Sequence, residues 1–292
     1  MKNQKQKKQK QKQNQNQNQN PSWQDLNPFI LSKIFSFLSP HDQLFGPPYV
    51  CHSWLSSTLH TIFKNSILDL RLIDTLDQEN QRLRFTHLLK LALNHYHGWV
   101  SIQFPSKHKF GYFGTVYIAE NTPNITSVAL SSEASVNMAP IFISLLYWQK
   151  LKIFEARMSP DVGYLVISQL VDWCKNMTEI RLHGSVLMER EVTCLVDGLS
   201  GLKILDLCES TLSCSAIGIV LDGRLKCVKE INLLHCKFVD DKGEDARADY
   251  LVFKAFRDEV VEKASGIKSL KKFVHCLKGT CLHCKDKASG NK

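Results

Sequence analysis

Metal-binding residue types gather near the C-terminus. Five His and Cys side chains fall within ten residues there: His275, Cys276, Cys281, His283 and Cys284. The Cys281-x-x-Cys284 pair has the spacing of zinc ligands, but a structural zinc site usually needs two such pairs. The chain has no second Cys-x-x-Cys, and Cys236 with His235 is the nearest substitute. We therefore expect no metal and no cofactor, with zinc as the less favoured alternative.

Catalytic motifs are missing from the sequence. It contains no glycine-rich dinucleotide motif, no P-loop, no G-x-S-x-G and no H-E-x-x-H. Isolated Cys and His pairs carry little weight in a chain with 10 Cys and 11 His. We expect a protein that is not an enzyme and that has no catalytic residues.

The charge of this 292-residue chain is concentrated at its two ends. The formal net charge is +9, of which residues 1–20 carry +6 and residues 263–292 carry +7, so residues 21–262 carry −4. A domain-wide nucleic-acid face is therefore not expected. Residues 1–20 are almost only Lys, Gln and Asn and predict a disordered tail. The alternative is a tail used for nuclear import or for salt-sensitive nucleic-acid contact, which would survive deletion of residues 21–292.

The sequence indicates a protein of the nucleus, the cytoplasm or both. The N-terminus has no apolar signal segment, and the apolar run 138–148 is too short to cross a bilayer. The cysteines are scattered, several inside apolar runs, which is typical of reduced core thiols.

Two amphipathic helical segments are predicted in residues 21–64. Asp25 can cap the first, whose apolar residues recur at spacings of three and four from Leu26 to Leu38, and Pro40 should end it. Residues 41–45 suggest a short helical turn, and residues 49–63 form the second segment. A helical hairpin of this size cannot bury a good core alone, so we expect something else to cover its apolar surface.

A repeat of about 26 residues follows. The pattern apolar-x-x-apolar-x-apolar recurs six times, with middle residues 26, 26, 26, 25 and 26 positions apart. These middle residues are Ile102, Val128, Phe154, Ile180, Leu205 and Ile231. Such a period predicts a leucine-rich-repeat array.

The spacing fits one short strand, one helix and two turns per repeat. Strands lie about 4.8 Å apart and packed helices about 8–10 Å apart, so the helix side must fan outward. We expect an α/β solenoid with a parallel concave sheet and convex helices, capped at one end by residues 68–72 and 88–93. Residues 250–261 and 270–277 should close the other end, with 240–249 as a surface loop.

Residues between the inward-facing ones should lie on the concave face, which is the expected surface for a protein partner. These candidates are mixed in charge, and Ala129 lies among them: Ser101, Gln103, Ser127, Glu155, Arg181, Asp206 and Asn232. The alternative is a merely solvated sheet face.

The chain resembles the plant F-box/leucine-rich-repeat proteins over roughly residues 21–277. The residues that carry the resemblance are Trp23-x-x-Leu26, Pro28-x-Ile30-Leu31, Ile34-Phe35-x-x-Leu38, Val50-Cys51-x-x-Trp54 and, in the repeats, Tyr117-Ile118-Ala119-Glu120-x-x-Pro123-Asn124. The resemblance implies a disordered tail (1–20), an F-box (21–64), leucine-rich repeats with caps (65–277) and a basic tail (278–292).

The resemblance also implies a role and a docking surface. In that family the F-box binds a Skp-type adaptor, which joins a cullin/RING scaffold, and the repeats bind the protein to be ubiquitinated. The expected role is substrate recognition in an SCF-type ubiquitin ligase, with an unknown protein substrate, no membrane partner and no specific nucleic acid. By motif position, these residues form or support the adaptor-facing surface: Leu26, Pro28, Ile30, Leu31, Ile34, Leu38, Val50 and Trp54.

Three positions depart from the family pattern. Phe29 stands where an acidic residue is usual, Gln43 where an apolar residue is usual, and His52 where a basic residue is usual. They leave open a second hypothesis, a repeat scaffold outside any ligase whose degenerate F-box does not bind the adaptor.

Overall fold

The computed structural model describes residues 23–63, 66–130, 138–157 and 163–277. The chain divides into two compact units. The N-terminal unit contains the described residues of 23–63 and 76–92, and the repeat unit contains 66–75 and the described residues from 93 onward.

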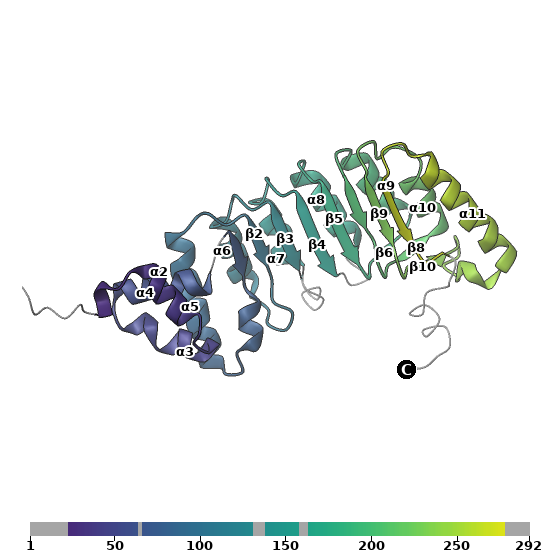
Figure 1. Ribbon diagram of the computed structural model, residues 1–292. Coiled ribbons are helices and arrows are strands. Elements are labelled where there is room, and N and C mark those ends of the chain that lie inside the picture. Colours follow the sequence, from purple (N-terminus) through teal and green to yellow (C-terminus); the bar gives the residue numbers. More distant parts are fainter. Residues whose placement is uncertain (1–22, 64–65, 131–137, 158–162, 278–292) are drawn as a thin grey trace, which may run out of the picture. The chain divides into compact units, whose positions relative to one another are not determined.

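The N-terminal unit is helical (Figure 1). Its elements are the 3-10 helix η1 (Trp23–Asp25), α2 (Pro28–Phe35), α3 (Pro40–Phe45), the 3-10 helix η2 (Pro47–Tyr49), α4 (His52–Ile62) and most of α5 (Glu79–His95). Helices thus form in both segments where the apolar spacing predicts them. The predicted cap, however, is wrong. Asn27 and not Asp25 caps α2, because the Asn27 side chain accepts a hydrogen bond from the Phe29 N–H at 2.8 Å.

Pro40 begins a helix instead of ending one. The helix α2 already stops at Phe35, and Ser39 caps α3 by accepting a hydrogen bond from the Asp42 N–H at 3.1 Å. Proline suits the first position of a helix, where its missing N–H costs nothing.

Aromatic side chains form much of the core of the N-terminal unit. Helices α2 and α4 pack together, and the Phe35 and Trp54 rings lie 5.2 Å apart. The Phe63 ring, just after α4, lies 5.6 Å from the Phe85 ring of α5, and both are buried. Helix α5 therefore supplies part of the cover that residues 23–63 need.

The repeat unit is built on a parallel sheet. Within the described residues, its eight strands are ordered β1-β2-β3-β4-β5-β7-β9-β11. The strands are β1 (Ile67–Asp69), β2 (Ser101–Gln103), β3 (Ser127–Leu130), β4 (Ile153–Arg157), β5 (Glu179–His183), β7 (Ile204–Asp206), β9 (Glu230–Leu233) and β11 (Lys272–His275).

The register of this sheet confirms the predicted repeat. The six middle residues of the apolar pattern, Ile102 to Ile231, pair with one another from strand to strand, and each is fully buried. The row continues at the ends, where Leu68 pairs with Ile102 and Phe273 pairs with Ile231. Neighbouring strands therefore bury one continuous apolar row, which no single repeat could bury alone.

Helices line one face of this sheet (Figure 1). They are α6 (Tyr112–Glu120), α7 (Ala139–Leu145), α8 (Gly163–Trp173), α9 (Glu189–Gly198), α10 (Cys214–Val220) and α11 (Tyr250–Gly266), each packed against the next. The spacing is tight between α8 and α9, since a Cβ at Gly198 would lie 2.3 Å from a Val171 methyl carbon. The fold is α/β, and its arrangement is compatible with a solenoid.

A second, smaller parallel sheet was not predicted. It joins β6 (Val186–Leu187), β8 (Thr211–Ser213) and β10 (Lys237–Val239). The turns that lead into these strands repeat as well, because Gly184, Glu209 and His235 all have φ between 59° and 68°. Strands of two or three residues are too short to show an alternating pattern.

The first cap differs from its prediction. Leu68 lies in β1, but Leu72 lies in the 3-10 helix η3 (Arg71–Thr75), so the alternation of Leu68, Leu70 and Leu72 does not continue as a strand. At the far end, α11 and β11 occupy the predicted positions.

The eight described cysteines are free thiols. Burial raises the pKa of the Cys174 and Cys236 thiols to about 12, so both stay protonated at neutral pH and serve as small core side chains. Within the described part of the chain, no helix is both long and apolar enough to span a membrane.

Candidate functional site

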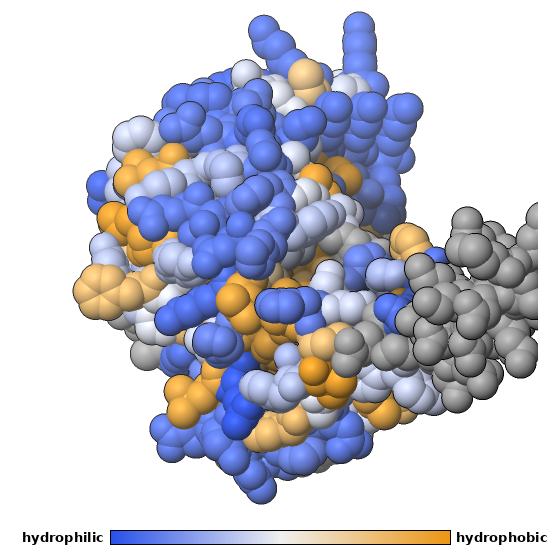
Figure 2. Space-filling model, turned by 90° about the vertical axis from the view of Figure 1, so that its left-hand side faces the viewer, coloured by the Kyte–Doolittle hydropathy of each residue, from blue (hydrophilic) through white to orange (hydrophobic). Residues whose placement is uncertain are grey.

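An apolar hollow opens on the surface of the N-terminal unit. We call it the N-terminal groove, and it encloses about 560 Å³. Its lining residues come from α2, α3, η2, the start of α4 and the short connections between them: Ile34, Phe35, Leu38, Asp42, Phe45, Gly46, Pro47, Val50 and Trp54. Figure 2 views the molecule from the side where these helices lie in Figure 1 and shows hydrophobic side chains exposed between hydrophilic ones.

The groove keeps large apolar side chains in contact with solvent. Ile34 is 42% exposed and Val50 is 53% exposed. Nearby in sequence, Phe29, Phe37 and Trp23 are at least 69% exposed. Contiguous exposed apolar surface of this kind marks an interaction site in a soluble protein.

Contacts of Trp54 and Arg84 fix the walls of the groove. The Trp54 indole N–H donates to the Trp23 carbonyl at 3.1 Å, and the Trp54 ring packs on Phe35. On the other side, the Arg84 guanidinium lies over the Phe45 and Tyr49 rings at 4.9 and 4.7 Å. The groove is thus held open by packed aromatic residues, which lowers the entropy lost when a partner binds.

The structure brings four of the eight predicted adaptor-facing residues together in the groove, namely Ile34, Leu38, Val50 and Trp54. Pro28 and Ile30 are exposed but do not line it, and Leu26 is half-buried. Leu31 is only 1% exposed, so it supports the core and cannot itself face a partner. Sequence reasoning missed Phe45 and Pro47, which the turn after α3 places in the groove wall.

The three departures from the family pattern have distinct surroundings. The Gln43 amide donates to the Phe35 and Leu38 carbonyls at 3.1 and 3.0 Å, which satisfies backbone groups left open where α2 ends. Phe29 is 75% exposed and meets the His60 ring edge-on at 6.2 Å. His52 is exposed at the start of α4.

In the repeat unit, the seven predicted partner-facing residues all lie half-buried in strands of the large sheet, between the inward-facing residues. Neighbouring strands align five of the seven, together with Ala129, in one row: Gln103, Ala129, Glu155, Arg181, Asp206 and Asn232. Ser101 and Ser127 pair in the adjoining row. We call this side of the sheet the open face.

The arginines of the open face pair with carboxylates of the same face. Arg181 pairs with Glu155 at 3.6 Å and also with Glu179, and Arg157 pairs with Glu209. Both arginines are therefore engaged by carboxylates of this chain and are not free to pair with a partner.

Asp206 joins this network through His183, whose Nε2 lies 3.4 Å from the carboxylate. Burial acts to raise the pKa of Asp206. Hydrogen bonds from His183, the Cys208 N–H and the Asn232 side chain outweigh burial, so this pKa stays below its usual value. Asp206 is therefore ionised at neutral pH.

Among the described residues, no group of three or more His, Cys, Asp or Glu side chains is arranged so that it could hold a metal ion. Cys276 Sγ lies 3.7 Å from His235 Nδ1. Cys281, His283 and Cys284 lie outside the described residues.

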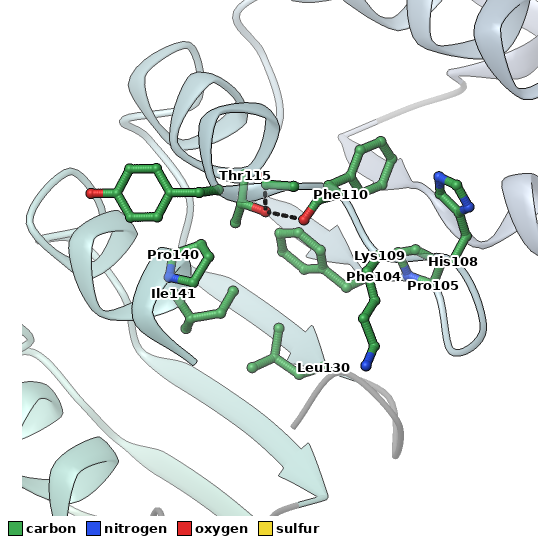
Figure 3. A pocket seen from close by; sticks show the side chains of 11 residues that line it. Phe104, Pro105, His108, Lys109, Phe110, Thr115, Leu130, Pro140 and Ile141 are labelled. Atoms are coloured by element: carbon green, nitrogen blue, oxygen red, sulfur yellow. Dashed lines mark hydrogen bonds between the residues drawn. The ribbon is translucent and has the colours of Figure 1, made fainter. Parts of the chain in front are cut away.

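A small pocket lies beside the carboxyl ends of β2 and β3 (Figure 3). We call it the loop pocket, and it encloses about 180 Å³. The segment 104–112 supplies most of the lining, together with side chains from α6, β3 and α7: Phe104, Pro105, His108, Lys109, Phe110, Gly111, Tyr112, Thr115, Leu130, Pro140 and Ile141.

Asp74 anchors the loop that forms this pocket. Its carboxylate accepts hydrogen bonds from the Ser106 N–H and hydroxyl at 2.6 and 3.0 Å, and from the N–H groups of Lys107 and His108 at 3.1 and 2.9 Å. Burial acts to raise the pKa of Asp74, but these donors hold it below its usual value of 3.8. No local sequence pattern identifies Asp74 as the anchor of this loop, because its hydrogen-bond partners lie 32 to 34 residues away.

We expect Asp74→Ala to destabilise the protein by about 1–2 kcal/mol at pH 7, because the loop N–H groups lose a charged acceptor. The folded-state pKa of Asp74 is lowered, so its stabilisation is present above about pH 3.8 and is lost as the pH falls through the folded value. Urea unfolding at pH 7 and pH 3 measures both. Asp77→Ala, an exposed carboxylate, is the matched control. An equal loss of stability at both pH values would contradict the assignment.

The chain is similar to one curated plant protein over nearly its whole length. It is 24% identical over 283 residues to an F-box/LRR-repeat protein of Arabidopsis thaliana, an alignment that covers 90% of this chain and 86% of that protein. No protein-family model matches the chain.

Proposed function

We propose that this protein is the substrate-recognition subunit of an SCF-type ubiquitin ligase. In this proposal the N-terminal groove binds a Skp-type adaptor, and the repeat unit binds the protein to be ubiquitinated. The observation that carries the proposal is the exposed apolar groove, lined by Ile34, Leu38, Val50 and Trp54 of the F-box-like motif. The similarity to the Arabidopsis F-box/LRR-repeat protein supports it in general terms.

The proposed mechanism is proximity, not catalysis. One unit holds the ligase and the other holds the substrate, so ubiquitin transfer gains from a raised effective concentration. The protein itself contributes no reacting group, and it is expected to act in the nucleus, the cytoplasm or both.

The open face is suited to recognising a protein. Its side chains present both hydrogen-bond donors and acceptors on a rigid sheet, and Arg181, Asp206 and Asn232 are half-buried and held by neighbours. Pre-oriented polar groups give specificity when they meet matching groups on a partner.

Affinity capture of the full-length chain tests this proposal. We expect the Skp-type adaptor, a cullin and a RING subunit to be retained together. Retention of other proteins without the adaptor would instead favour the second candidate, a repeat scaffold outside any ligase. Phe29 motivates that candidate, because it places an exposed aromatic ring where the F-box pattern usually has an acidic residue.

A further inference from the structure

The interior of the loop pocket offers apolar surface. Phe104, Leu130 and Ile141 contribute side chains that are only 5–6% exposed, and Pro140 lies beside them. Thr115 brings a hydroxyl, but this group already donates to the Phe110 and Gly111 carbonyls at 3.3 Å. Figure 3 shows the first of these bonds above the Phe104 ring. A group that enters the pocket therefore gains mainly by burying apolar area.

The size of the pocket limits what can enter. Sites for whole small-molecule ligands enclose about 300–1,000 Å³. The loop pocket encloses about 180 Å³ and is open to solvent. That volume suits one bulky side chain of a peptide whose backbone runs across the opening.

In the part of the chain that the structure describes, the loop at the rim of the pocket carries more positive than negative charge. Lys109 lines the pocket, and Lys107 lies two residues earlier in the same loop. Both lysines are exposed, and no ion pair involves either of them among the described residues. Asp74 is the nearby carboxylate, and its oxygens already accept four hydrogen bonds from the loop. Among the described residues of this loop and its anchor, two ammonium groups thus stand against one carboxylate.

This charge distinguishes the pocket from the open face. There, Arg157 and Arg181 each pair with a glutamate. The free lysines at the pocket rim can instead attract carboxylates of a partner, at a distance and in a salt-dependent way.

The loop is also organised before any partner arrives. Asp74 fixes three successive backbone N–H groups, from Ser106 to His108, so Lys107 lies in an ordered turn and Lys109 follows directly after it. A preformed site loses less entropy on binding than a mobile one.

We propose that the loop pocket binds one bulky apolar side chain of an acidic peptide segment in the recognised protein. The apolar side chain enters between Phe104, Leu130 and Ile141, and the flanking Asp or Glu residues face Lys107 and Lys109. This inference rests on the proposed function, since it specifies the substrate class that the repeat unit takes.

A peptide-display library of random 12-residue sequences, selected on the full-length chain, tests the inference. We expect retained peptides to share one Leu, Ile, Met or Phe flanked by acidic residues. A retained peptide should bind Lys107→Glu/Lys109→Glu about tenfold more weakly than the wild type, and its affinity should fall as salt is raised. Lys254→Glu is the matched control, because Lys254 is exposed on α11 and does not line the pocket. It should change the affinity less than about twofold.

A second variant tests the apolar half of the site. Ile141→Ala removes one wall, so selection should move towards larger anchor residues while the acidic preference stays. Its thermal unfolding midpoint shows whether the variant remains folded.

Three results would overturn the inference: no retained peptide, retained peptides without an acidic and apolar consensus, or equal weakening by Lys254→Glu. Adaptor binding by the same protein sample separates this failure from failure of the proposed function. If the adaptor binds and the peptides do not, only the peptide site is wrong.

Discussion

Replacing Ile34 and Val50 with glutamate is expected to weaken binding of the Skp-type adaptor by about a hundredfold or more. Both side chains line the N-terminal groove and are 42% and 53% exposed, so the substitutions leave the core intact. In the bound state each new carboxylate would be buried against apolar surface without a partner. A central interface residue contributes about 2 kcal/mol or more, and each 1.4 kcal/mol is a factor of ten in affinity.

Titration calorimetry with purified adaptor measures this effect. Leu83→Glu is the matched control, since Leu83 is 64% exposed on α5 of the same unit and does not line the groove. The control should bind like the wild type. Equal affinities for the double variant and the wild type would show that the groove is not the docking surface.

Trp148→Ala is expected to reduce the free energy of unfolding by about 3–5 kcal/mol. The Trp148 side chain is fully buried, and its ring lies 6.3 Å from Phe104. Its indole N–H also donates to the Thr122 hydroxyl at 3.2 Å, one repeat earlier in the chain. The substitution therefore leaves a large cavity and removes a buried hydrogen bond between neighbouring repeats, while the Thr122 hydroxyl keeps its bond to the Ile118 carbonyl at 2.7 Å.

Urea unfolding of the full-length chain measures the loss. Trp173→Ala is the matched control, because Trp173 on α8 is 41% exposed and its indole N–H donates to Gln169 of its own helix. We expect it to cost less than about 1 kcal/mol. Similar losses for the two variants would mean that the repeats do not depend on shared packing at Trp148.

The repeat is the part of the fold that the sequence predicts best. Its signal is periodic, so six weak patterns reinforce one another, and the observed pairing of Ile102 through Ile231 follows the predicted register. The small sheet β6-β8-β10 escapes prediction because its strands are two or three residues long. The sequence also does not predict the left-handed backbone conformation at Glu209 and His235, since neither residue is glycine.

The candidate sites are predicted less completely than the fold. Helical spacing puts Ile34, Leu38 and Leu31 on similar faces, but it cannot tell that Leu31 is buried while Ile34 is exposed. That difference depends on α4, which packs against α2 from about 25 residues away in the chain. The loop pocket depends on hydrogen bonds between Asp74 and residues 106–108, which no local pattern encodes.

Binding of the purified full-length chain to a purified Skp-type adaptor tests the central claim most directly. Size-exclusion chromatography with light scattering would measure the mass of the mixture. The proposed function predicts a stable one-to-one complex, which the Ile34→Glu/Val50→Glu variant does not form. If the two proteins elute separately at micromolar concentrations, where the unmixed chain is folded, the chain is not an adaptor-binding ligase subunit.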